Sequence, residues 1–207
     1  MKQLGFYIDS SRCSGCKTCQ VSCKDKNDID VGRKFRRIYE YGGGSWAKDS
    51  DGAWSHQTFA YYLSVACNHC DDPICVAGCP TQAMHKRQDN GLVLVDQDKC
   101  IGCRYCAMRC PYGAPQYDKE KNVMSKCDGC LDRLEQGLNP VCVDSCPQRA
   151  IEFGDINELR AKYGNQRDVA PLPDSRITSP NLIVRTHSNA VASNSNIGEL
   201  QNPTEVK

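Results

Sequence analysis

The sequence predicts an α+β fold in which short strands and short helices alternate with loops. Three observations predict it: 16 of the 207 residues are cysteine, large apolar side chains are scarce with 4 Phe and 2 Trp, and short segments recur along the chain. Such a chain is short of the large apolar side chains that usually build a core. We therefore expect bound metal or cross-linked cysteines to supply much of its stability.

The most informative segment is Cys100 to Pro111, with the sequence CIGCRYCAMRCP. Its spacing, C-x2-C-x2-C-x3-C followed by proline, is that of bacterial ferredoxins, in which three thiolates bind one [4Fe–4S] cluster and the fourth binds a second. One such run implies another. The four groups that account for all 16 cysteines are Cys13, Cys16, Cys19 and Cys23; Cys67, Cys70, Cys75 and Cys79; Cys100, Cys103, Cys106 and Cys110; and Cys127, Cys130, Cys142 and Cys146.

Two kinds of segment are each used twice, which predicts two ferredoxin-like modules. Residues 8–19 align with 95–106, and residues 73–84 parallel 140–151. The first kind reads as a strand end, a turn and a cysteine loop. The second kind carries two cysteines, and a proline follows the second of them.

Secondary structure around the cysteines is expected to be short. Runs of β-branched and aromatic residues bounded by Gly and Asp predict edge strands at 6–9, 92–96 and 151–153. Short helices are expected to start at 20–22 and 107–109, between the third and fourth cysteines of two groups. Gly15 and Gly102 lie between ligands. Either they let backbone N–H groups approach the cluster sulfurs, or they are ordinary turn glycines.

Two segments lie outside the modules. Residues 28–66 contain the basic and aromatic run 33–41, and they are too long for a simple connection, which predicts a loop insert. Within that run, Arg33 to Arg37 are expected to form a solvated face or a subunit contact. Residues beyond about 164 are rich in Asn, Ser and Pro, which predicts an extended tail that is disordered or laid against a partner; the apolar residues at 182–184 favour a partner.

Composition excludes several functions. With 26 Lys and Arg against 25 Asp and Glu, the net charge is +1, which argues against a nucleic-acid partner. The longest largely apolar stretch, 59–67, is far too short to span a membrane, and the first residues show neither an export signal nor a twin arginine. We find no nucleophile with its base and no phosphate-binding loop, so we expect no catalytic residue and no direct small-molecule substrate. The four histidines are expected to pack or to form hydrogen bonds rather than to bind metal.

Structural zinc and disulfides are the alternatives for the cysteines. Zinc sites favour C-x2-C pairs and rarely place a third cysteine two residues further on. Synthesis without an export signal favours metal over disulfides. Two classes of function remain open: a subunit that conducts electrons, and a self-standing metalloprotein, either built on zinc or acting as a free polyferredoxin. The long insert and the tail favour the subunit.

The order of the four cysteine groups, with a long insert inside the last, resembles the four-cluster electron-transfer subunits of molybdopterin oxidoreductases. The match is closest to the iron–sulfur subunits of anaerobic dimethyl sulfoxide reductases and covers most of the chain. The segments that carry this narrower resemblance are 35–41, 83–87, 110–117, 126–130 and 170–173.

The resemblance implies the middle subunit of an anaerobic respiratory complex. A membrane anchor would oxidise quinol, this chain would relay electrons through four [4Fe–4S] clusters, and a molybdopterin catalytic subunit would reduce dimethyl sulfoxide or other S- and N-oxides. The complex would lie on the bacterial cytoplasmic membrane, on the periplasmic face after co-export with the catalytic subunit. A sister complex acting on polysulfide, tetrathionate or formate is the alternative. Nitrate reductase relatives have Trp in place of Cys103, so Cys103 argues for four clusters of one type.

The resemblance also implies ligand sets that join the outer cysteine groups to each other and the inner groups to each other. The sets are Cys13, Cys16, Cys19 and Cys146; Cys127, Cys130, Cys142 and Cys23; Cys67, Cys70, Cys75 and Cys110; and Cys100, Cys103, Cys106 and Cys79. The modules would be 1–27 with 119–163, and 67–118, separated by the insert 28–66 and followed by the tail 164–207. Lys17, Lys24, Arg104 and Arg109 are the cations expected to raise the cluster potentials.

Overall fold

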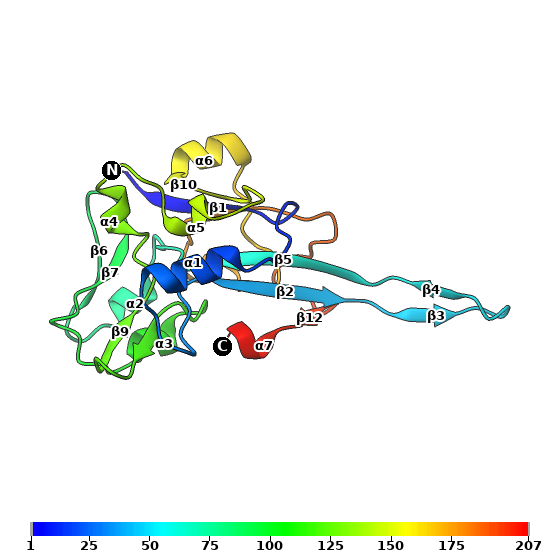
Figure 1. The fold of residues 1–207 in the computed structure, drawn as a ribbon, viewed down its shortest axis with the longest axis horizontal. Helices are drawn as coiled ribbons and strands as arrows, with labels where there is room; N and C mark the ends of the chain where they lie inside the picture. Colours follow the sequence, from blue (N-terminus) through cyan, green and yellow to red (C-terminus); the bar gives the residue numbers. More distant parts are fainter. Residues whose placement is uncertain (1, 207) are drawn as a thin grey trace.

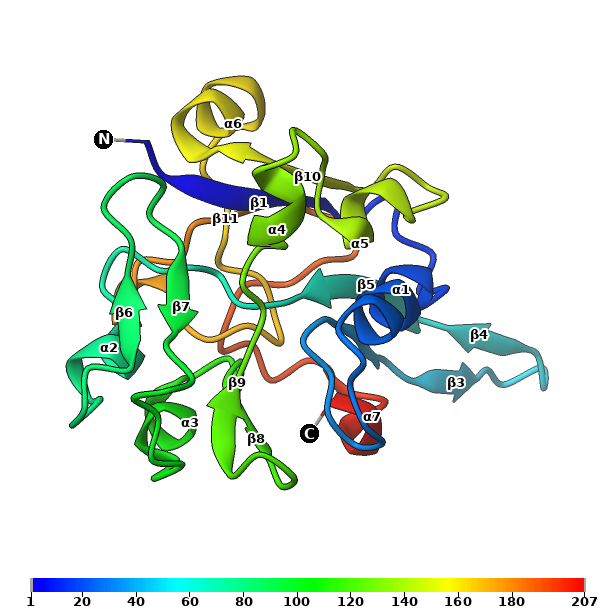
Figure 2. The ribbon, with the colours of Figure 1, turned by 60° about the vertical axis from the view of Figure 1, so that its left-hand side comes forward.

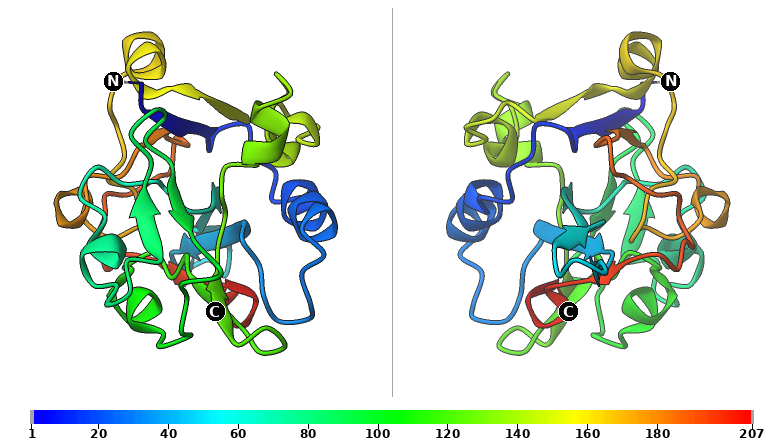
Figure 3. Two further views of the ribbon diagram at one scale, coloured as in Figure 1. Left: turned by 90° about the vertical axis from the view of Figure 1, so that its left-hand side faces the viewer. Right: turned by 90° about the vertical axis from the view of Figure 1, so that its right-hand side faces the viewer.

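The computed structural model describes residues 2–206, and its strands and helices are all short. Strands and helices are mixed along the chain, which confirms the α+β class. The elements form a body from which one long two-stranded arm projects (Figure 1). The three-stranded sheet that holds the N-terminal strand lies over a second three-stranded sheet from which the arm extends (Figure 3).

The N-terminal strand β1 (Leu4–Asp9) is the middle strand of the first sheet. It pairs antiparallel with β10 (Ile151–Asp155), where Phe6 lies opposite Phe153, and parallel with β11 (Leu182–Arg185) (Figure 2). The strands expected at the start of the chain and after the last cysteine are therefore confirmed. The prediction that β1 is an edge strand is wrong, because β11 from the C-terminal region occupies its free edge.

One helix covers this sheet. Helix α6 (Ile156–Tyr163) begins where the Asp155 carboxylate accepts a hydrogen bond from the N–H of Asn157, which satisfies a donor that the helix itself cannot pair. Its apolar side, which includes Leu159, packs on the sheet beside Ile183, whose side chain is completely buried. The helix therefore joins the start, the middle and the end of the chain in one cluster.

The second sheet corrects the prediction of a loop insert. Strands β2 (Arg37–Gly43) and β5 (Phe59–Val65) pair along seven residues, and β12 (Glu199–Leu200) adds to the other edge of β2. The hairpin continues into β3 (Trp46–Lys48) and β4 (Trp54–His56), which form the arm (Figure 1). Aromatic and β-branched residues make up three of the seven residues of β2 and four of the seven of β5, and such residues favour a pleated, half-buried surface over a loop.

Two small hairpins form the part of the body that carries the inner cysteine groups. One joins β6 (Met84–Lys86) to β7 (Val93–Val95), which confirms the strand expected there. The other joins β8 (Gln116–Asp118) to β9 (Val123–Ser125). Each strand has three residues, so neither hairpin has enough pairing to be stable alone.

Each of the remaining helices in the body contains a cysteine or directly follows one. They are α1 (Thr18–Lys26), α2 (Ile74–Ala77), α3 (Tyr105–Arg109), α4 (Leu131–Leu134) and α5 (Val141–Asp144). The two helix starts that the sequence predicted lie inside α1 and α3, which begin two residues earlier because the third cysteine of each group is in the first turn. No helix within residues 2–206 has the length and apolarity that crossing a bilayer requires.

The C-terminal region packs against its own chain, which corrects the prediction of an extended tail. It contains the short helix η1 (Ser175–Ile177), strands β11 and β12, and helix α7 (Pro203–Val206). The guanidinium of Arg37 donates to the carbonyl of Val206 at 2.9 Å and to the carbonyl of Tyr112 at 2.6 Å. The three apolar residues of β11 were enough to complete a sheet, because β1 offered an unpaired edge.

Candidate iron–sulfur centres

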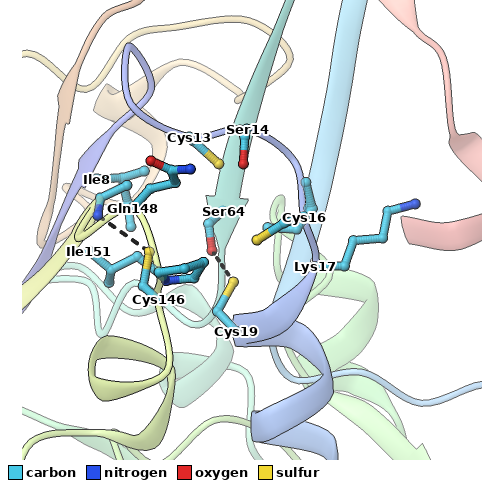
Figure 4. Close-up of a pocket in the computed structure, with 13 residues that line it drawn as sticks. Ile8, Cys13, Ser14, Cys16, Lys17, Cys19, Ser64, Cys146, Gln148 and Ile151 are labelled. Carbon is cyan, nitrogen blue, oxygen red and sulfur yellow. Dashed lines mark hydrogen bonds between the residues drawn. The ribbon is translucent and has the colours of Figure 1, made fainter.

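Four cysteines from separate parts of the chain surround one cavity (Figure 4). Cys13 and Cys16 lie on the loop after β1, Cys19 lies in the first turn of α1, and Cys146 follows α5. Their sulfurs point into the same space. Cys13 and Cys146 are 133 positions apart in the sequence, so the antiparallel pairing of β1 with β10 brings them together. The apolar residues that line the cavity include Ile8, Ile38, Ala150 and Ile151.

The loop that carries Cys13 and Cys16 has a left-handed backbone at two positions. Gly15 has φ +70°, and a Cβ there would lie 2.6 Å from the ring of Tyr62, so glycine is needed both for the conformation and for the close approach. Lys17 has φ 62° and precedes the first turn of α1. Burial raises the pKa of Cys13 to about 11, and a hydrogen bond from the Gly15 backbone opposes the rise. Gly15 therefore has the left-handed conformation of a turn glycine, and its backbone also acts on the sulfur of Cys13.

The second copy of this loop builds a second cavity. It is lined by Cys100 and Cys103 from the loop after β7, by Cys106 in α3, and by Cys79, which follows α2. Gly102 and Arg104 repeat the left-handed conformations, with φ of +66° and 65°. Two backbone N–H groups donate to these sulfurs: that of Met84 to Cys79 at 3.4 Å and that of Met124 to Cys100 at 3.2 Å.

The remaining eight cysteines fall into two further groups. Burial raises the pKa of Cys23 to about 12, and the nearby sulfurs of Cys142 and Cys130 add to the rise. Cys127 is buried in the same cluster as Cys23, and burial raises its pKa well above the usual value, with Cys23 adding to the rise. These four cysteines therefore lie close to one another.

The fourth group forms around Cys70. Burial raises the pKa of Cys70 to about 12, and the sulfurs of Cys67, Cys110 and Cys75 act in the same direction. The pKa of Cys75 is raised to about 12 by burial and then by Cys67 and Cys110. Thiols with such raised pKa values are protonated when no metal is bound, so binding of iron must displace protons from them.

Sulfurs of different groups also lie close enough to raise one another's pKa. Cys142 contributes to the raised pKa of Cys19, Cys67 contributes to that of Cys127, and Cys106 contributes to that of Cys75. The Cys13 group therefore lies next to the Cys142 group. The Cys142 group lies next to the Cys67 group, and the Cys67 group lies next to the Cys106 group.

The donor chemistry fits [4Fe–4S] clusters. All 16 cysteines are free thiols, and each of the two cavities is lined by four of them, as many as the irons of one cubane. Backbone N–H groups are directed at the sulfurs, as Gly129 donates to Cys127 at 3.4 Å and Ala150 donates to Cys146 at 3.3 Å. Within residues 2–206, no three Cys, His, Asp or Glu side chains converge as closely as a single metal ion requires.

The cations that the sequence singled out lie at the surface. Arg104 and Arg109 are exposed, and the Arg104 guanidinium stacks on the ring of Tyr117 at 3.8 Å. The Lys17 ammonium pairs with Glu205 at 2.6 Å and Glu40 at 3.4 Å. Salt and water screen the charges of such groups, which weakens their effect on a buried cluster.

Lys24 forms its hydrogen bonds away from the cysteines. Its ammonium donates to backbone carbonyls of the loop that follows α1, including that of Arg33 at 3.3 Å. Within the part of the chain that the structure describes, Lys17 is the one of these four cations that lines either of the two cavities, at the rim of the first beside Cys16. Closeness to a cysteine in the sequence therefore did not identify the cations that lie close to the sites.

Three buried cations were missed by sequence reasoning. Arg36 is 1 % exposed, Arg37 is 3 % exposed and Lys126 is 6 % exposed, and each of them lowers the pKa of a nearby cysteine. The prediction that Arg33 to Arg37 form a solvated face is wrong for Arg36 and for Arg37. The Lys126 ammonium donates to the carbonyls of Val93 and Cys127. A run of basic residues gave no signal of this burial.

His69 forms a hydrogen bond inside the protein. His69 lies between Cys67 and Cys70 and is completely buried, and its Nδ1 accepts a hydrogen bond from the N–H of Val93 at 3.0 Å. Burial is the main cause that lowers the pKa of His69 well below its usual value, so the ring is neutral. This confirms a hydrogen-bonding and packing role.

The fold and the cysteine arrangement define an iron–sulfur protein with short ferredoxin-like elements. A family model described as "4Fe-4S dicluster domain" matches residues 58–156. The chain is 57 % identical over 204 residues to the probable anaerobic dimethyl sulfoxide reductase chain YnfG of Escherichia coli strain K12, covering 99 % of this chain and 98 % of the relative.

Two further relatives agree. The B subunit of the anaerobic dimethyl sulfoxide reductase of Escherichia coli strain K12 is 56 % identical, covering 99 % of this chain and 98 % of the relative, and that of Haemophilus influenzae is 55 % identical over the whole of both proteins. The protein belongs to the family of iron–sulfur subunits of anaerobic dimethyl sulfoxide reductases. It is an electron-transfer subunit of a molybdopterin oxidoreductase and binds iron–sulfur clusters of the [4Fe–4S] type.

Proposed function

We propose that this chain relays single electrons through four [4Fe–4S] clusters, from a quinol-oxidising membrane anchor to a molybdopterin catalytic subunit that reduces dimethyl sulfoxide or other S- and N-oxides. The observation that carries the proposal is the gathering of 16 free cysteines into four groups of four, two of which line cavities. The names of the close relatives support the substrate. Each cluster, when bound, takes up and releases one electron.

The ligand sets in this proposal are the four spatial groups. They are Cys13, Cys16, Cys19 and Cys146; Cys23, Cys127, Cys130 and Cys142; Cys67, Cys70, Cys75 and Cys110; and Cys79, Cys100, Cys103 and Cys106. The fourth thiol of a sequence group reaches into the neighbouring spatial group. Cys23, for example, is four residues after Cys19 on α1 but belongs to the next site. Such exchange keeps neighbouring clusters at a fixed separation.

The protein itself contributes position, burial and hydrogen bonds. Buried apolar side chains exclude water from the sites, and backbone N–H groups donate to the sulfurs, both of which set the potential of a thiolate-bound cluster. No residue has to bind the terminal substrate, because the protein only conducts electrons. We propose that 1–27 with 119–163 and 67–118 are the two modules, which the pairing of β1 with β10 supports.

The arm supports a role for residues 28–66 in subunit contacts. Trp46 and Trp54 are 61 % and 64 % exposed on it, and the Lys48 ammonium lies 5.8 Å from the ring centroid of Trp54. We place the complex on the periplasmic face of the cytoplasmic membrane, held there by the anchor subunit. The C-terminal region, which packs on its own chain, is proposed to present its outer side to the partners.

The test is the iron content and electron capacity of the complex isolated without oxygen. We expect about sixteen irons in this chain, four per cubane, and four separate one-electron steps in a redox titration. Clusters reduced by a quinol analogue should reoxidise when dimethyl sulfoxide is added. Stoichiometric zinc with little iron, or clusters that a quinol reduces but dimethyl sulfoxide does not reoxidise, would contradict the proposal.

A further inference from the structure

The side chain of Arg36 occupies an unusual place for a cation. It immediately precedes β2, and it is the largest of the completely buried side chains, with 1 % exposure. Its guanidinium carbon lies 4.5 Å from the centroid of the Phe6 ring, which belongs to the middle strand of the first sheet. Stacking on this ring holds the plane of the guanidinium in place.

The hydrogen bonds of Arg36 are incomplete. Its Nη1 donates to the carbonyl of Ser64 at 3.2 Å and to the Ser64 hydroxyl at 3.0 Å. Nε and Nη2 are buried and have no hydrogen-bond partner. Within residues 2–206, Arg36 forms no ion pair with a carboxylate. A cation that is buried in this way costs several kcal/mol unless an anion compensates it.

The groups around the guanidinium supply that anion. The sulfurs that act on Arg36 are, in decreasing order, those of Cys142, Cys19, Cys127 and Cys23. Cys19 belongs to the first ligand set of the proposed function, and the other three belong to the second. Thiolate-bound clusters carry net negative charge, so the guanidinium lies between two anionic centres, with two N–H groups free to donate to them.

We propose that Arg36 is a positioning residue that lies between the first two clusters, donates hydrogen bonds to their sulfurs and raises both of their reduction potentials. The inference rests on the ligand sets of the proposed function. Reduction adds one negative charge to a cluster, and a nearby buried cation stabilises the reduced form more than the oxidised form. None of the four cysteines that act on Arg36 belongs to the other two ligand sets, so the potentials of those clusters depend much less on Arg36.

Ser64 extends the effect of Arg36 to one of the two clusters. Its hydroxyl accepts from Nη1 of Arg36, so its own hydrogen is free to donate to the sulfur of Cys19, 3.3 Å away (Figure 4). The positive charge on Arg36 polarises this hydroxyl and strengthens the bond to the sulfur. Ser64 therefore raises the potential of the first cluster only, whereas Arg36 raises both.

The test is a redox titration of the isolated complex, followed by electron paramagnetic resonance, together with the iron content of each variant. Arg36→Gln removes the charge and should lower the midpoint potentials of two of the four clusters. Arg36→Lys keeps the charge and should lower them less. Ser64→Ala should lower only the potential of the cluster bound by Cys19. Arg12→Gln is the control, because Arg12 is an exposed cation next to Cys13 and should shift no potential detectably.

Three results would overturn the proposal: unchanged potentials in Arg36→Gln with full iron content, a shift shared equally by all four clusters, or an equal shift in Arg12→Gln. If Arg36→Gln does not take up its clusters, the potentials of Ser64→Ala are the deciding measurement. An unchanged midpoint potential of the first cluster in Ser64→Ala overturns the role of Arg36. A wild-type complex with far fewer irons than about sixteen contradicts the proposed function instead. The two failures are therefore distinguishable.

Discussion

Two regions of the molecule hold the same cysteine loop in different ways. The sheet region, made of the two three-stranded sheets, surrounds the loop of Cys13 with strands of up to seven residues and a large apolar cluster. The hairpin region, residues 67–125, surrounds the loop of Cys103 with two hairpins and a small buried cluster of Met84, Val93, Cys106 and Met124. The partly buried neighbours of that cluster include three further cysteines.

The difference shows that a repeated sequence fixes the backbone of a site but not what supports it. Gly15 and Gly102 have φ values of +70° and +66°, so the two loops share one conformation. The first loop rests on protein that is stable through strand pairing and apolar burial. The second rests on elements that are too short to persist alone, so the bound clusters must supply the missing stability.

The largest effect expected from this comparison follows removal of iron. In the protein stripped of its clusters, we expect amide hydrogens of β6, β7, β8 and β9 to exchange almost as fast as in an unfolded chain. Those of β1, β2 and β5 should stay protected, because their sheets bury apolar residues apart from the cysteines. Hydrogen exchange measured by mass spectrometry would check this. Equal protection in both regions would contradict the comparison.

A smaller effect separates the two loop glycines. A Cβ at Gly102 would lie 2.4 Å from the backbone oxygen of Asn122, whereas one at Gly15 would lie 2.6 Å from the side-chain ring of Tyr62. A ring can turn aside more easily than a backbone carbonyl. Both substitutions also carry a left-handed strain of about 1–2 kcal/mol.

Gly102→Ala should therefore lose about four irons, the content of one cubane, while Gly15→Ala should keep more of its iron. Iron content per protein molecule, measured on both variants after the same anaerobic preparation, would check the order. An equal or larger loss in Gly15→Ala would show that the support of the two loops does not differ as described.

The smallest of these effects is on the stability of the C-terminal region, which contributes β11 to the first sheet. Ile183 is completely buried in β11, so Ile183→Ala should lower the free energy of unfolding by about 2–5 kcal/mol. Ile197 is 62 % exposed in the same region, and Ile197→Ala should change it by about 0.5 kcal/mol or less. Anaerobic urea denaturation would compare them. Equal, small changes in the free energy of unfolding of the two variants would show that the C-terminal region is only loosely attached to the sheet.

Sequence alone predicted the parts of the fold that repeat. The cysteine spacing defined both loops, and the short apolar runs located β1, β7 and β10. These features depend on neighbours in the chain, so they leave a local pattern. The segment at 182–184 left a pattern too, but its partner was not evident, because the free edge of β1 is more than 170 positions away.

The cations show where sequence reasoning fails. Lys17 and Arg104 are close to cysteines in the sequence. Toward the surface, however, Lys17 pairs with Glu205 and Arg104 stacks on Tyr117. Arg36 is more than ten residues from any cysteine and is buried among four of them. A basic residue in a charged run is ordinarily solvated. Only the anionic sites that form around it make burial favourable, and those sites exist only in three dimensions.

The central claim is that the outer cysteine groups share ligands, so that Cys13 and Cys146 hold one cluster and Cys23 holds its neighbour. The most direct measurement is the electron paramagnetic resonance spectrum of the reduced complex in the variants Cys13→Ser, Cys146→Ser and Cys23→Ser. Serine replaces a thiolate poorly on iron, so each variant should convert or lose one cluster. We predict that Cys13→Ser and Cys146→Ser alter the same spectral component and that Cys23→Ser alters a different one. If Cys13→Ser and Cys23→Ser alter one component while Cys146→Ser alters another, each sequence group holds its own cluster and the account is contradicted.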